Sequence, residues 1–311
     1  MPFIEQYQKQ VALLVHVLPF VAEEKVFALK GGTAINLFIR DMPRLSVDID
    51  LTYLPVKARA ESLADIDAAM TRISDRIKES VAGAKVAPSR ADGTITKLVV
   101  RADHTQIKIE VTPVLRGCVY EPETRAVSES VEDAYGFAEM PVVSFADLYG
   151  GKIVAALDRQ HPRDLFDVRD LLANEGISPE LRNAFIVYLL SHDRPMSEVL
   201  EPTRKDISDE FLQNFDGMTD EPVTREELVA AREALIKTIV EEMPDAHRHF
   251  LVGFEKGEPD WSLLEVAGVA NLPAVKWRQQ NLDRVVPAKR RQLVQRLEEV
   301  LLGSESKKAT R

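Results

Sequence analysis

Several short segments in the first half of the chain either alternate apolar and polar residues or are almost entirely apolar, as expected of strands that bury one face or both. The segments are residues 26–29, 47–51, 98–102 and 106–111. Residues 60–80 instead place apolar side chains three or four positions apart, which is typical of an amphipathic helix. This mixture of strands and helices predicts an α+β fold built on a small mixed sheet.

Beyond Pro141 nearly every segment has helical periodicity, and the segments are separated at glycine or proline. The expected breaks are Gly176, Pro195, Pro222, Pro244 and Pro287. Residues 121–140 are polar, and we interpret them as a connector. The pattern therefore predicts a sheet domain at 1–140, followed by a mainly helical domain at 141–311.

The most apolar stretch, residues 11–20, is short, has no basic leader and is interrupted by His16 and Pro19. It favours a core helix packed on the sheet over a membrane span. The chain has 311 residues, 45% of them hydrophobic and 29% charged, which is ordinary for a globular protein. Its single cysteine, Cys118, excludes an internal disulfide and favours a reducing cytoplasm. We therefore expect a cytoplasmic protein that does not bind a membrane.

Candidate chemistry begins at Asp48-Ile49-Asp50. Side chains alternate along a strand, so both aspartates share one face while Ile49 points to the core. Paired carboxylates suit Mg²⁺, or Mn²⁺, and leave coordination positions open for phosphates. The alternative is a solvated strand end, which is common for isolated Asp-x-Asp sequences.

Gly31 and Gly32 precede this pair and separate a buried strand from a short helix beginning at Thr33. Glycine allows the backbone to approach a ligand closely, and free amides at a helix start favour anions. A triphosphate is therefore expected here, although a Gly-Gly pair is more often only a tight connection.

Glu110 is the candidate third acid, because two metal ions about 4 Å apart need more ligands than one aspartate pair supplies. Alternation places Ile107, Ile109 and Val111 on the core face, with Lys108 and Glu110 on the other. Taken alone, Glu110 would be interpreted as a solvent-facing residue. With Asp48 and Asp50 it completes an expected metal site.

Two blocks support a family resemblance: Lys30–Phe38 with Arg44–Leu51, and Phe145–Arg159 with His161–Asp167. They resemble the AbiEii/AbiGii toxins among the polymerase-beta-like nucleotidyltransferases. Stretches near Phe250–Phe254 and Leu272–Trp277 are also similar, so the likeness spans most of the chain.

The resemblance implies a nucleotidyltransferase that consumes an NTP, releases pyrophosphate and acts as the toxin of a type IV toxin-antitoxin or abortive-infection system. The acceptor expected from the resemblance is the 3′ end of tRNA, which some relatives use, and the partner implied is a cognate antitoxin. Matched by position, Gly32, Thr33 and Ser46 contact phosphate, and Asp48 and Asp50 bind metal. Here the motif has Gly-Gly-Thr where many relatives have Gly-Ser, which keeps a hydroxyl at the site.

The second block contributes Lys152 as the helical lysine and either Asp164 or Asp167 as the last acid. Lys152, with Arg159 or Arg163, is expected to grip the β and γ phosphates. Without the resemblance, Lys152 would be interpreted as a solvated helix lysine, and the alternating Arg and Asp residues as surface ion pairs.

The net charge of −10 is unusual for a nucleic-acid binder, but the charges are unevenly distributed. Residues 276–311 carry a local net charge of +6, whereas residues 201–245 are acidic. The basic region permits an RNA acceptor at the C-terminal helices, although a solvated helix with a polar tail is the simpler interpretation.

Two alternatives differ in class from RNA nucleotidyl transfer. One is nucleotidyl or phosphoryl transfer to a protein side chain, which uses the same triphosphate site. The other is a catalytically silent relative that binds RNA or a partner protein. The presence of all three acids argues against the silent relative, whereas the residues do not distinguish RNA from protein as the acceptor.

Overall fold

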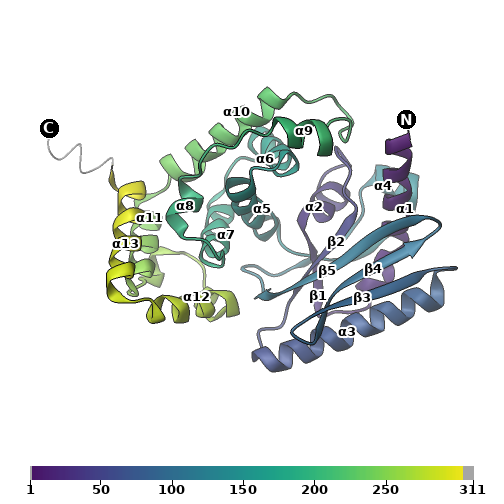
Figure 1. The fold of residues 1–311 in the computed structure, drawn as a ribbon, viewed down its shortest axis with the longest axis horizontal. Coiled ribbons are helices and arrows are strands. Elements are labelled where there is room, and N and C mark those ends of the chain that lie inside the picture. The colour runs from purple at the N-terminus through teal and green to yellow at the C-terminus, as the bar shows by residue number, and fades with distance from the viewer. Residues whose placement is uncertain (1, 304–311) are drawn as a thin grey trace. The chain divides into compact units, whose positions relative to one another are not determined.

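The computed structural model describes residues 2–303, which form two compact units (Figure 1). The first unit extends to Ser144 and also contains Asp216–Pro222. The second unit comprises Phe145–Phe215 and the chain from Val223 onward. The first unit contains all the described strands, and the second is helical, so the α+β expectation is confirmed.

A seven-stranded mixed sheet forms the first unit, in the order β3-β4-β5-β2-β1-β7-β6. Strand β2 lies antiparallel to β1 and parallel to β5, and β5 lies antiparallel to β4. The strands are β1 (Phe27–Lys30), β2 (Asp48–Tyr53), β3 (Lys85–Ala91), β4 (Thr94–Ala102), β5 (Thr105–Arg116), β6 (Glu123–Ala126) and β7 (Glu139–Val142).

Alternation along the central strands builds the core of this unit. Ile49, Leu51 and Ile109 are fully buried, as the sequence pattern predicts. Helices α1 (Pro2–Ala22) and α3 (Arg59–Ser80) pack on the sheet, where α1 contacts β5 and α3 contacts β4. Burial of these apolar faces is the main source of the unit's stability. Within residues 2–303, no helix has the length and apolarity that a membrane span requires.

The prediction that residues 121–140 form only a polar connector is wrong. This segment contains β6, helix α4 (Glu129–Tyr135) and the start of β7. Strand β7 pairs with β1 in parallel and places Met140 and Val142 in the core. The polar composition hid these elements because β6, at the sheet edge, leaves Glu123, Thr124 and Ala126 exposed.

The second unit is built from helices separated near the predicted glycine and proline breaks. The helices are α5 (Phe145–Arg159), α6 (Pro162–Asn174), α7 (Pro179–Leu190), α8 (Met196–Leu200), α9 (Ser208–Asn214), α10 (Arg225–Ile236), α11 (Asp245–Lys256), α12 (Pro273–Arg284) and α13 (Pro287–Leu301). Of the basic residues counted in the C-terminal region, Lys307, Lys308 and Arg311 lie outside the described residues.

Helices α5 and α7 approach each other closely at Gly150. A Cβ atom at this position would lie 2.9 Å from the Phe185 backbone nitrogen and 3.0 Å from the Ala184 carbonyl carbon. Gly150 therefore allows the backbones of α5 and α7 to come into contact, whereas any larger residue would push the two helices apart. This contact fixes the helix that carries Lys152 against the core of the second unit.

Candidate active site

A row of charged side chains crosses one face of the sheet in the first unit. Strand β2 presents Asp48 and Asp50 on this face, opposite the buried Ile49. In the register with β5, Asp50 pairs with Glu110 and Asp48 pairs with Lys108. Because paired positions in neighbouring strands share a face, the three predicted acids lie on the same side of the sheet.

Two lysines that sequence reasoning missed extend this row at both ends. Lys30 on β1 pairs in register with Asp50, and Lys97 on β4 pairs with Glu110. The Lys97 Nζ atom lies 2.7 Å from Glu110 Oε1, and this hydrogen bond raises the pKa of Lys97. Burial lowers the pKa of Lys30, and the negative charge of Asp50 opposes that shift. The row therefore places two neighbouring acids, on β5 and β2, between a lysine on β4 and a lysine on β1.

The Gly-Gly pair lies directly beside these acids. Gly31 and Gly32 are the first residues of helix α2 (Gly31–Ala34), which continues into the π-helical turn η1 (Ile35–Ile39). The helix therefore begins two residues earlier than predicted. Gly31 has φ of 78°, and a Cβ atom there would lie 2.6 Å from Asp50 Oδ2. Only glycine combines this backbone conformation with such a close approach.

Gly32, Thr33 and Ser46 form a second part of the site. The Thr33 and Ser46 hydroxyl oxygens lie 3.1 Å apart, and the Thr33 hydroxyl donates to the Asp48 carbonyl oxygen. A Cβ atom at Gly32 would lie 2.9 Å from both Ser46 Oγ and Arg44 Nη2. Arg44 is only 3% exposed, so a buried guanidinium lies against the glycine and hydroxyl groups matched to phosphate contacts.

The segment that carries Arg44 is positioned by residues far along the chain. Leu45 donates its backbone N–H to the Met218 carbonyl at 3.0 Å, and Asp220 donates to the Pro43 carbonyl at 3.0 Å. Arg44 and Thr219 form an antiparallel bridge between these hydrogen bonds. Residues 216–222 thus return to the first unit and fix the connection that leads into β2.

In the second unit, Lys152 on α5 contacts both candidate acids of α6. Its Nζ atom lies 2.9 Å from Asp164 Oδ1 and 2.9 Å from Asp167 Oδ2. Lys152 is 9% exposed, and the two aspartates are 3% and 2% exposed. The interpretations of Lys152 as a solvated lysine and of these aspartates as surface ion-pair residues are therefore wrong. They form one buried charge cluster.

The predicted arginines have different surroundings. Arg159 is mostly exposed, and its Nη2 atom donates to Asp164 Oδ2 at 2.8 Å, so it caps the buried cluster from the solvent side. Arg163 is partly exposed at the start of α6, where its backbone N–H donates to His161 Nδ1 at 3.1 Å. Further along α6, Arg169 and Asp170 do form the kind of local ion pair that the alternating sequence suggests.

A family model described as nucleotidyl transferase AbiEii toxin, type IV toxin-antitoxin system, matches residues 12–279. The chain belongs to this family. Both the Asp48, Asp50 and Glu110 row and the Lys152 cluster fall within the matched region. This member of the family is thus a nucleotidyltransferase toxin of a type IV system, and membership implies an NTP substrate and a cognate antitoxin.

The solved structure of MenT4, a nucleotidyltransferase toxin from Mycobacterium tuberculosis H37Rv, resembles this AbiEii protein with a TM-score of 0.57. The two sequences are 18% identical, and the likeness covers 88% of this chain and 92% of MenT4. This structural likeness supports the same fold for the two proteins. None of the curated protein sequences matches the chain.

Replacing Gly31 with alanine is expected to lower the transfer rate by about 100-fold, because a misplacement of about 1 Å at a reacting centre has that effect. The new methyl group would displace the Asp50 carboxylate, and the positive φ would also destabilise the fold by about 1 to 2 kcal/mol. The turnover number and the urea midpoint measure the two effects.

The matched control is Gly83→Ala, since Gly83 has a similar φ of 70° with no atom within 4 Å of an added Cβ. Gly83→Ala should lose comparable stability while keeping its activity. Equal activity in the two variants would show that the Gly31–Asp50 contact is unimportant for the reaction.

Proposed function

We propose that this AbiEii protein transfers a nucleoside monophosphate from an NTP to the 3′ end of tRNA, using a divalent metal held by Asp48, Asp50 and Glu110. The observation that carries the proposal is the register of β2 and β5, which aligns the three acids beside Gly31 and Gly32. The acids would supply the metal ligands. The neighbouring glycines and hydroxyl groups, which we call the phosphate cradle (Gly31, Gly32, Thr33 and Ser46), would supply the phosphate contacts in the same unit of the chain.

The donor set fits Mg²⁺ or Mn²⁺, since all three candidate ligands are carboxylates. Among residues 2–303, no group of three or more His, Cys, Asp or Glu side chains is already arranged around a metal position. Lys97 instead holds the Glu110 carboxylate, in an ion pair whose side chains are 37% and 39% exposed. Exposed pairs of this kind contribute little net stability, so a divalent cation can displace Lys97 from Glu110.

The residues of the phosphate cradle are the candidate contacts for the triphosphate of the NTP. We assign Gly31, Gly32, Thr33 and Ser46 to the triphosphate, and the last three match the phosphate-contacting positions of the family motif. Arg44 is a further candidate, because its Nη2 group lies against Gly32. A guanidinium suits phosphate oxygens better than an ammonium, since it can donate two parallel hydrogen bonds.

We propose that Lys152 acts on the β and γ phosphates, with Arg159 or Arg163, and that Asp164 and Asp167 orient the Lys152 ammonium. This assignment rests on the family motif and on the contacts of Lys152 with both carboxylates. A lysine shared by two buried carboxylates is fixed in direction, which would help it to contact an anion with a defined geometry.

The reaction is an in-line displacement at the α phosphorus. A hydroxyl oxygen of the acceptor forms the new bond to phosphorus, the bond to the bridging oxygen breaks, and pyrophosphate leaves with that oxygen. The hydroxyl proton passes to Asp48 or Glu110, the two candidate bases. When bound, the metal would polarise the phosphoryl oxygens and stabilise the charge that develops during transfer.

We propose the tRNA acceptor and a cytoplasmic location from the resemblance to the family. A tRNA acceptor suits a toxin, because modification of its 3′ end would block translation, which takes place in the cytoplasm. The antitoxin is a separate protein. Transfer to a protein side chain would use the same triphosphate contacts, so the experiment must separate the two acceptors.

The test incubates the protein with Mg²⁺, total tRNA and each of the four NTPs labelled at the α phosphate, in parallel with an Asp48→Ala variant. The proposal predicts label on RNA with the wild type only, and the labelled NTP identifies the donor. Label on protein alone would reject the RNA acceptor. Equal labelling by the Asp48→Ala variant would reject the metal site.

A further inference from the structure

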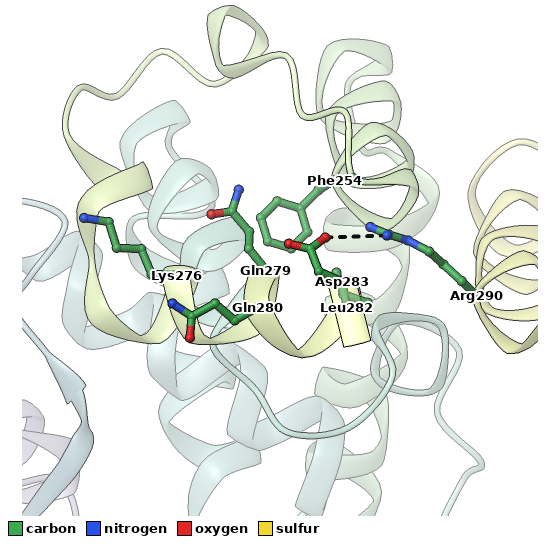
Figure 2. Close-up of a pocket in the computed structure, with 8 residues that line it drawn as sticks. Phe254, Lys276, Gln279, Gln280, Leu282, Asp283 and Arg290 are labelled. Atoms are coloured by element: carbon green, nitrogen blue, oxygen red, sulfur yellow. Dashed lines mark ion pairs between the residues drawn. The ribbon is translucent and has the colours of Figure 1, made fainter. Parts of the chain in front are cut away.

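A pocket of about 290 Å³ lies in the second unit, where α11, α12 and α13 meet (Figure 2). Its volume is near the lower end of the range for ligand pockets, about 300 to 1,000 Å³, so it suits one nucleoside-sized group. The lining residues are Phe254, Gly257, Lys276, Gln279, Gln280, Leu282, Asp283 and Arg290. We propose that this pocket binds one unpaired nucleotide of single-stranded RNA, which deepens and depends on the proposed RNA acceptor.

The polar lining suits the edge of a base. Gln279, Gln280 and Asp283 come from the same helix, α12, and Figure 2 shows Gln279 and Asp283 near the Phe254 ring. Each glutamine amide offers both donors and an acceptor, and the carboxylate accepts from the amino group of cytosine or guanine. These groups can therefore form hydrogen bonds with a base that has left its stack.

Arg290 places a hydrogen-bond donor without an acceptor in the wall of the pocket. It reaches the pocket from α13, with Nε donating to the Glu255 carbonyl oxygen at 3.0 Å and Nη1 lying 3.6 Å from Asp283 Oδ1. Its Nη2 atom is buried and forms no hydrogen bond with any residue from 2 to 303. A buried donor without an acceptor is costly, and a base carbonyl or phosphate oxygen would satisfy it.

Gly257 makes room for this guanidinium. A Cβ atom at Gly257 would lie 2.4 Å from Arg290 Nη2, and its φ of 84° also favours glycine. The left-handed conformation closes the end of α11. The same residue therefore ends α11 and leaves space for Arg290 in the pocket wall.

An exposed tryptophan follows Lys276 on α12. Trp277 is 53% exposed, which is unusual for so large an apolar side chain. Gln280 and Arg284 follow it at intervals of three and seven residues, so they share its side of the helix. An exposed aromatic ring beside cationic groups is the usual platform for stacking single-stranded bases.

The surrounding charge favours a nucleic acid. Four basic residues of α12 and α13 are exposed, and none forms an ion pair with another described residue: Lys276, Arg284, Lys289 and Arg291. Many other cations in the structure have acidic partners, such as Lys256 with Glu298 at 2.7 Å. Cations without acidic partners beside a stacking ring are available to contact phosphates.

The test measures binding of a short fluorescein-labelled single-stranded RNA to the full-length protein by fluorescence anisotropy, with EDTA and without NTP. Trp277→Ala should weaken binding by about 5- to 150-fold, the range for loss of one stacked base. Lys276→Glu should weaken binding and reduce the slope of log affinity against log salt by about 0.7, the contribution of one phosphate contact.

The control for charge is Lys237→Glu, an exposed lysine of the same unit that lies 3.8 Å from Glu242 and outside the pocket. Gln279→Leu keeps the side-chain size and removes the amide, so it should change the preference among homopolymeric RNAs. Wild-type affinity in both Trp277→Ala and Lys276→Glu, or equal affinity for a duplex of the same sequence, would overturn the proposal.

The binding test is independent of catalysis. RNA binding that is lost in these variants, together with label on protein only in the transfer experiment, would refute the RNA acceptor while supporting the pocket. RNA labelling by the wild type, together with unchanged RNA binding in the variants, would refute the pocket while supporting RNA transfer.

Discussion

Asp48→Asn is expected to lower the rate of nucleotidyl transfer by at least about 1,000-fold, as does the loss of a principal electrostatic group in other active sites. Asparagine keeps the size of the side chain but removes the charge that a divalent cation requires. Asp48 is only partly buried, and its backbone carbonyl still accepts from Thr33, so the fold should be retained. The measurements are the turnover number and the melting temperature.

The control is Asp103→Asn, at a turn between β4 and β5 where φ is 46°. Asparagine tolerates this left-handed conformation as well as aspartate does, so both activity and stability should remain at wild-type values. Near-wild-type transfer by a folded Asp48→Asn protein would remove Asp48 from the metal site.

Lys152→Met should produce the largest loss of stability, about 3 to 5 kcal/mol in the free energy of unfolding, because it breaks a buried ion pair from one side. The substitution leaves the carboxylates of Asp164 and Asp167 buried without the ammonium that contacts both. Arg159 reaches only one of them and is mostly exposed. Urea denaturation followed by circular dichroism measures the effect.

Two further variants make this result interpretable. Lys256→Met removes a lysine from an exposed pair with Glu298 and should change stability by about 1 kcal/mol or less. The triple variant Lys152→Met, Asp164→Asn, Asp167→Asn removes all three charges and should recover most of the loss. If Lys152 also acts on phosphate, the recovered triple variant remains inactive. A single Lys152→Met variant of wild-type stability would contradict the burial of this cluster.

The sheet and the face that carries the candidate acids were predictable because strand alternation directly encodes which side chains are buried. Ile49, Ile109 and Val111 lie in the core as expected, and Asp48, Asp50 and Glu110 lie on the opposite face. Strand β3 was missed, because most of its residues are exposed and it includes Pro88. Exposed edge strands lack the apolar alternation on which such predictions depend.

The lysines and Arg44 were missed because their positions depend on contacts between distant segments. Lys97 reaches Glu110 only through the register of β4 with β5, which the sequence of either strand does not specify. Arg44 is fixed by residues 216–222, which lie far along the chain. Local sequence patterns predict the elements and their buried faces. Which charged side chains come into contact depends on the register between strands and on contacts between segments that are distant in the sequence.

The buried cluster in the second unit shows a different limit. Alternating Arg and Asp residues on a helix predict exposed ion pairs, and Arg169 with Asp170 follows that rule. Asp164 and Asp167 do not, because Lys152 on α5 supplies a cation inside the core. Whether a charged helix position is buried depends on its neighbour in space, and the family motif was the only indication of that neighbour in the sequence.

Manganese binding tests the central claim most directly, that the acids on β2 and β5 form a metal site. Electron paramagnetic resonance of Mn²⁺ titrated into the full-length protein reports bound metal without any reaction. We expect binding by the wild type, loss of binding in Asp48→Asn combined with Asp50→Asn, and binding at least as tight in Lys97→Met, where no ammonium competes for Glu110. Equal binding by the wild type and the double variant would contradict the account.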